Sequence, residues 1–153
     1  MRVVHVLASC VWVGGTVVLV FVGVPAIRWL EGEARATAMR ALGRRWRPLG
    51  WSAMGVAIVS GLWLTDEHGG LNRATLDSDF DRTLIVKSVL VAVLCVGALL
   101  HDYVLGPRLQ RELRAQAPEA PVTRRRLVAV GWVNFALTLA VPVLGVMVLS
   151  YVD

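Results

Sequence analysis

The chain has 153 residues, of which 56% are hydrophobic, and its mean hydropathy is +0.63. A soluble domain of this size cannot cover so much apolar surface, which excludes a water-soluble enzyme or binding module. The formal net charge is +5, and the placement of the basic residues accounts for it without a nucleic-acid partner.

Four apolar stretches have about the length needed to cross a bilayer, because a hydrocarbon core of about 30 Å takes about 20 helical residues. In chain order they are 3–27, 48–65, 83–105 and 127–151. They use most of the sequence, and no internal repeat is apparent. We therefore expect an all-α protein, one membrane domain over residues 1–153, built as a four-helix bundle.

The segments between the spans differ in charge. Residues 28–47 and 106–126 are rich in arginine, whereas residues 66–82 carry mainly aspartate and glutamate. Arginine and lysine mark cytoplasmic segments. We therefore expect a multi-pass protein of the cytoplasmic (inner) membrane with both termini outside. Within the first basic segment, apolar side chains recur at helical spacing between arginines, which predicts a short interfacial helix over residues 31–45.

Two ionisable side chains lie inside predicted spans near the outer face. His5 begins the first span, and Lys87 lies about one turn into the third. Such groups are costly in a membrane, so each is a functional candidate. The fourth span returns outward and brings Met147 to the same level. We expect the three to converge on one outward-facing site, although headgroup contact, snorkelling and packing are the structural alternatives.

Further polar residues surround this candidate site. Ser9 and Trp12 share a helical face with His5, at offsets of four and seven, and are expected to support it. His101 and Asp102 lie at the cytoplasmic end of the third span, where they form either a second polar site or a surface ion pair. The helical rise separates the two histidines by ~20–25 Å, so they cannot ligate one haem iron.

The available donors suit a soft metal or a haem. Copper favours thioether and imidazole ligands, which Met147 and His5 supply. Haem b would take His5 as its axial ligand. Cys10 and Cys95 lie inside spans and are expected to pack rather than to form a disulfide. No nucleophile with its base, phosphate-binding loop or zinc motif is present, so we assign no catalytic residue.

The run HVLASCVWVGG at residues 5–15 resembles the first span of the CopD family, membrane domains linked to copper resistance and copper uptake. The run RTLIVK at 82–87, Gly97, and the exit LGPRL at 105–109 resemble the third span of that family. This resemblance implies a membrane protein that binds or transports copper through a site near the outer face. In that reading His5 ligates the metal, Met147 assists, and Lys87 holds an anionic partner or tunes the site.

The same histidine and lysine also resemble those of the HemJ-type proteins, which are haem-binding protoporphyrinogen oxidases. There the first-span histidine and third-span lysine are functional, and they map to His5 and Lys87. Asn134 resembles the asparagine of a fourth-span Asn-Glu pair, but Phe135 follows it here. The alternative function is therefore a haem b-dependent membrane oxidoreductase, and a third is a small structural subunit. The expected partners are the lipid bilayer, a second copy of the chain in a homodimer, and an outer-compartment metal carrier.

Overall fold

The computed structural model describes residues 1–67 and 79–150, and within these ranges every element is helical. Four helical stretches are long and apolar enough to cross a membrane: Arg2–Ile27, Gly32–Glu67, Asp79–Arg114 and Ala120–Val148. The all-α class and the four expected spans are thus confirmed. Most of the acidic segment expected on the outer side lies outside the described residues. The side to which each terminus projects stays a prediction.

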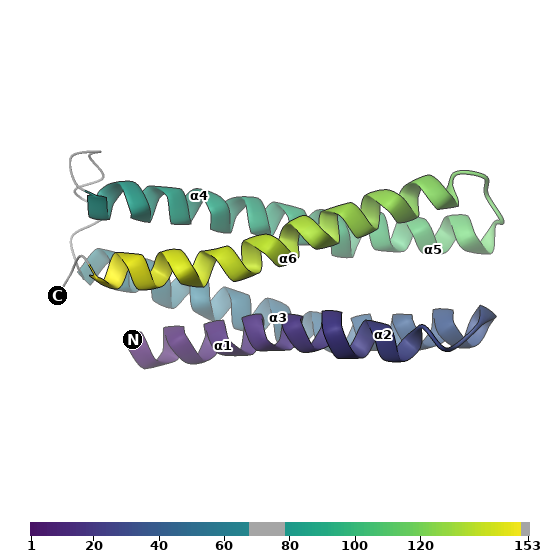
Figure 1. Cartoon of the computed structure of the whole chain (residues 1–153), viewed down its shortest axis with the longest axis horizontal. Coiled ribbons are helices and arrows are strands. Elements are labelled where there is room, and N and C mark those ends of the chain that lie inside the picture. The colour runs from purple at the N-terminus through teal and green to yellow at the C-terminus, as the bar shows by residue number, and fades with distance from the viewer. Residues whose placement is uncertain (68–78, 151–153) are drawn as a thin grey trace. The chain divides into compact units, whose positions relative to one another are not determined.

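The chain divides into two compact units, Met1–Ala74 and Thr75–Asp153. In each unit the described helices form an antiparallel hairpin (Figure 1). The expectation that all four spans form one bundle and one domain stays a prediction. Each hairpin is described by itself below.

The first unit contains α1 (Arg2–Val18), a π-helical turn η1 (Leu19–Gly23), α2 (Val24–Ile27) and α3 (Gly32–Glu67). Pro25 lies in the first turn of α2, where a missing backbone N–H is tolerated. The chain then turns back through Gly32, whose positive φ of 51° is a conformation that glycine adopts at little cost. This turn places α3 alongside α1 (Figure 1).

All but Glu31 of the residues expected to form a short interfacial helix belong to α3. They are helical, but they continue into the second span without a break, and Pro48 lies inside the helix. The alanines, leucines and arginines around it favour a helix, which offsets the lost backbone donor and the steric clash that a proline brings to a helix interior. A separate interfacial helix is therefore not formed. The position of this segment at the membrane surface stays a prediction.

The second unit contains α4 (Asp79–Leu99), a π-helical turn η2 (Leu100–Leu105), α5 (Gly106–Arg114) and α6 (Ala120–Ser150). α4 packs along α6 (Figure 1). In α5, Arg108 Nε donates to Glu112 Oε1 at 2.6 Å. The backbone N–H of Ala117 donates to the Glu112 carbonyl at 2.9 Å, and Gln116 takes a positive φ of 50°. The backbone bond from Ala117 closes the turn that leads toward α6.

Few side chains are buried within either hairpin. Small residues such as Ala8 and Ala53 in the first unit and Ala98 in the second line the helix contacts, whereas many valines and leucines are exposed. Small residues let helix backbones approach closely, which is how helices associate in lipid. The exposed apolar side chains are those expected of a surface that meets lipid or further helices.

Candidate functional site

His5 lies at the contact between α1 and α3. Its Nδ1 lies 2.8 Å from the carbonyl oxygen of Ala57 and 3.2 Å from the hydroxyl of Ser60. The Ser60 hydroxyl donates to the Val56 carbonyl at 2.6 Å, so its oxygen can accept from the imidazole. Ser60 is itself buried. The ring is thus anchored on α3 by a backbone carbonyl and a hydroxyl.

These bonds assign the tautomer of His5. A carbonyl oxygen only accepts hydrogen bonds, so the short contact with Ala57 requires a proton on Nδ1. In the neutral imidazole, Nε2 then carries the lone pair. Histidines that bind metals commonly show this arrangement, with one nitrogen donating to a backbone carbonyl and the other ligating the metal. This arrangement agrees with a metal-ligand role for His5, which stays a prediction.

Gly61 provides the space in which the imidazole lies. A methyl group at this position would come within 3.0 Å of Cε1 and 3.3 Å of Nδ1 of His5. Ala57, whose carbonyl accepts from the ring, lies one turn earlier on the same helix. A side chain at position 61 would lean back over that turn, so glycine also leaves the carbonyl accessible. The sequence alone did not indicate the role of Gly61.

Trp12, expected to support the site, lies two turns further along α1. Its ring pairs with Trp46 of α3, with centroids 6.3 Å apart and planes inclined by 33°. Trp46 packs so closely against Gly15 that a methyl group there would overlap its ring. The Trp12 Nε1 is buried with no hydrogen-bond partner among the described residues. Ser9 is half-buried, one turn from His5.

Lys87 and Met147 belong to the second unit. Lys87 extends from α4 to α6, where its Nζ lies 3.3 Å from the place that a Cβ of Gly145 would occupy. Met147 follows two residues later on α6 and is exposed. The structure thus brings Lys87 to the same turn of α6 as Met147. Because His5 belongs to the other unit, the convergence of the three residues stays a prediction.

His101 and Asp102, the second polar site of the sequence analysis, lie in η2. The Nδ1 of His101 donates to Oδ1 of Asp102 at 2.9 Å, and Nε2 points toward Gly131 of α6. Both side chains are partly exposed. π-helical turns are often found at functional sites, which keeps this pair a candidate. The hydrogen-bonded pair itself agrees with the ion-pair alternative.

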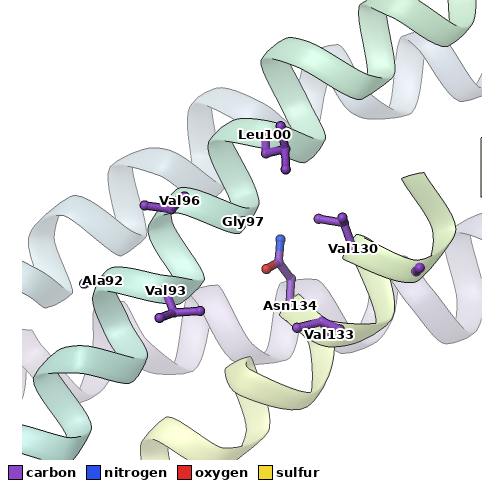
Figure 2. A pocket seen from close by; sticks show the side chains of 9 residues that line it. Ala92, Val93, Val96, Gly97, Leu100, Val130, Val133 and Asn134 are labelled. Atoms are coloured by element: carbon purple, nitrogen blue, oxygen red, sulfur yellow. The ribbon is translucent and has the colours of Figure 1, made fainter. Parts of the chain in front are cut away.

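Asn134 of α6 lines a groove between α4 and α6, and its side chain extends toward α4 (Figure 2). Its carboxamide packs against Gly97, where a methyl group would overlap it. The groove has a volume of about 500 Å³, and the other lining residues are apolar: Ala92, Val93, Val96, Leu100, Ala129, Val130 and Val133. The sequence placed Asn134 in the fourth span but gave no contact for it.

No group of three or more histidine, cysteine, aspartate or glutamate side chains forms a metal site within residues 1–67 and 79–150. Cys10 is exposed, Cys95 is half-buried, and neither forms a disulfide in the described structure. Within these ranges the candidate metal ligands stay the imidazole and thioether donors named above. The imidazole of His5 is held in place by hydrogen bonds to Ala57 and Ser60.

Comparison with known families identifies the family to which the chain is related. The family model for copper resistance protein D, CopD, matches residues 39–147. The chain belongs to the CopD family. The match includes Lys87, His101, Asn134 and Met147, whereas His5 precedes the matched residues. No curated protein and no solved structure matches the chain.

Membership of the CopD family, together with four membrane-spanning helices, indicates a multi-pass membrane protein with a copper-related function. The family resemblance drawn from the sequence is thereby confirmed. The relation to HemJ-type proteins is not shown, and nothing in the described residues favours a haem.

Proposed function

We propose that this CopD-family protein binds copper at a site built on His5 and passes it through the membrane. The observation that carries this proposal is the anchored imidazole, whose Nδ1 donates to the Ala57 carbonyl above Gly61. This leaves Nε2 with the lone pair that a copper ion requires. The family relation supports copper as the metal, and the anchored imidazole supports His5 as its ligand.

An imidazole inside a membrane span is costly unless it has partners and a purpose. Here Ser60 and a backbone carbonyl satisfy Nδ1, which offsets part of that cost. The further roles suggested by the sequence, Met147 as a thioether ligand and Lys87 as the partner of an anionic group, stay predictions.

Copper analysis of the purified full-length protein in mild detergent tests this proposal. We expect copper(I) bound in a simple stoichiometric ratio, and loss of that copper in His5→Ala. His101→Ala is the matched control, because it removes an imidazole from the other unit. Copper that persists in His5→Ala, or that depends on His101 instead, would overturn the proposed site.

The visible spectrum of the same samples separates copper from haem. We expect no Soret band in the oxidised or the dithionite-reduced protein. A Soret band that disappears in His5→Ala would show that this imidazole ligates haem b instead of copper. A protein that binds neither would leave the structural subunit as the best account.

A further inference from the structure

One constant shift in residue number aligns the first helical stretch of the first unit, which begins with α1, with that of the second unit, which begins with α4. The shift that carries His5 to Lys87 also carries Gly15 to Gly97 and Pro25 to Pro107. Both glycines are sites of close approach, because Trp46 packs on Gly15 and Asn134 packs on Gly97. Both prolines lie in the first turn of a helix that follows a π-helical turn.

The exposed faces of these helices match under the same shift. Val11 and Val93 are 44% and 49% exposed, and Phe21 and Tyr103 are 58% and 54% exposed. The two π-helical turns, η1 and η2, also fall at corresponding places. π-helical turns are rare, so their recurrence at one place in both hairpins is a strong correspondence.

The second helices correspond in the same way. The shift that carries Gly61 to Gly145 carries Met54 to Thr138, which are 5% and 2% exposed and among the most buried residues of their units. It also carries Leu49 to Val133, which are 54% and 57% exposed. At the positions compared, exposed residues therefore match exposed ones on both helices of the hairpin, and buried residues match buried ones on the second helix.

His5 lies over Gly61 in the first hairpin, and Lys87 lies over Gly145, the matching glycine, in the second. Cε1 of His5 and Cε of Lys87 are the same number of bonds from their backbones. They lie 3.0 Å and 3.8 Å from the places that a Cβ of Gly61 and of Gly145 would occupy. The two side chains thus reach the corresponding point of the second helix in their own units.

We propose that the two units are repeats of one hairpin and that Lys87 occupies the ligand position that His5 occupies in the first repeat. In the second repeat this position carries an ammonium group, which suits an anionic group such as a carboxylate, where the first carries a metal ligand. An imidazole at position 87 would therefore find a backbone carbonyl placed as that of Ala57 is, while Leu144 stands where Ser60 contributes its hydroxyl in the first repeat. Gly145 leaves the carbonyl of Val141, one turn earlier, accessible. Gly61 does the same for the carbonyl of Ala57.

A rescue experiment on the full-length protein tests this equivalence, and it rests on the proposed function of His5. Copper(I) binding is measured for the wild type, His5→Ala, and His5→Ala combined with Lys87→His. We expect the combined variant to recover copper affinity to within about 10-fold of the wild type, the lower end of the range for altered ligand support. His5→Ala combined with Val86→His is the control, because Val86 is exposed on the same turn of α4.

The outcomes separate the two proposals. If His5→Ala abolishes copper binding and Lys87→His fails to restore it, the equivalence is wrong and the role of His5 stands. If Val86→His restores copper as well as Lys87→His does, the equivalence is also wrong. If the wild type binds no copper through His5, the proposed function fails, and a measurement without copper decides the equivalence.

That measurement is nitrogen NMR of histidine-labelled protein in nanodiscs, with Lys87→His compared with the wild type. We expect the introduced imidazole to show the same Nδ1-protonated tautomer as His5, with no averaging between tautomers. An imidazole that averages between tautomers, as an exposed side chain does, would overturn the equivalence. A Lys87→His chain that does not fold would count against it too, because an equivalent position accepts an imidazole.

Discussion

The Nδ1 of His5 donates to the carbonyl oxygen of Ala57, one helical turn before the glycine over which the imidazole lies. This bond ties the first helix to the third at the place where the candidate ligand is held. It also fixes which nitrogen is available to a metal. The position of the ring therefore depends on a residue that has no side chain.

Gly61→Ala tests that dependence. The added methyl would lie 3.0 Å from Cε1 of His5, so the ring must shift by a few tenths of an ångström and disturb its bond to the Ala57 carbonyl. We expect copper affinity to fall by about 10–100-fold, the range seen when the support of a ligand histidine is removed. Equilibrium competition with a copper(I) chelator measures the change.

Gly55→Ala is the control for this change, because it places the same methyl on α3 where nothing lies within 4 Å. Its copper affinity should equal that of the wild type. Equal losses in both variants would show that α3, rather than the imidazole, is sensitive to substitution.

Trp46→Ala should destabilise the first hairpin. Trp46 packs against Gly15 and pairs with Trp12, so its removal leaves a cavity that the backbone at glycine cannot fill. We expect a loss of about 3 kcal/mol in the free energy of unfolding. Trp29→Ala, at a side chain that is 90% exposed, should change it little. Unfolding by SDS titration in mixed micelles compares the two.

Gly97→Ala should destabilise the second hairpin by about 1–3 kcal/mol, because the added methyl overlaps the Asn134 carboxamide. Asn134→Ala removes the obstacle, so the double variant should regain most of the loss. A double-mutant cycle on unfolding free energies measures this coupling. Additive losses would mean that the contact between the two residues does not limit the packing of α4 on α6.

The topology predicted from charge can be tested by labelling. With Cys10 and Cys95 replaced by alanine, a cysteine introduced at Glu119, in the turn before α6, should react with an impermeant maleimide only from the cytoplasmic side. A cysteine introduced at Asp66 should react only from the outer side. The reason is that arginines flank Glu119, and such segments are retained in the cytoplasm. Labelling with the opposite preference would invert the orientation.

The spans were predictable because length and hydropathy suffice to define a membrane helix. The extent of α3 was not, since Pro48 and the arginines before it suggested a boundary that the helix passes through. The candidate ligand His5 was predictable from its cost in a membrane. Its tautomer was not, because the Ala57 carbonyl lies far away in sequence and only the folded hairpin brings it near.

The glycines show most clearly what the sequence could not give. Gly61, Gly97 and Gly145 look like ordinary small residues of apolar spans, and each becomes informative only through the side chain that packs on it. The correspondence between the two hairpins was not apparent from the sequence for the same reason. Histidine and lysine, or methionine and threonine, share no similarity until their burial and partners are compared.

The π-helical turn η2 has a consequence for how α4 and α5 tolerate changes in length. A π-helical turn holds one residue more than an α-helical turn, as a single-residue insertion would produce. Deleting Leu100 should therefore convert η2 to an ordinary turn while the helices on either side keep their facing. Deleting Val91 instead would rotate Lys87 by about 100° away from Gly145, given 3.6 residues per turn. η2 is thus the place along this helix where a residue can be deleted while the helices on either side keep the same faces toward α6.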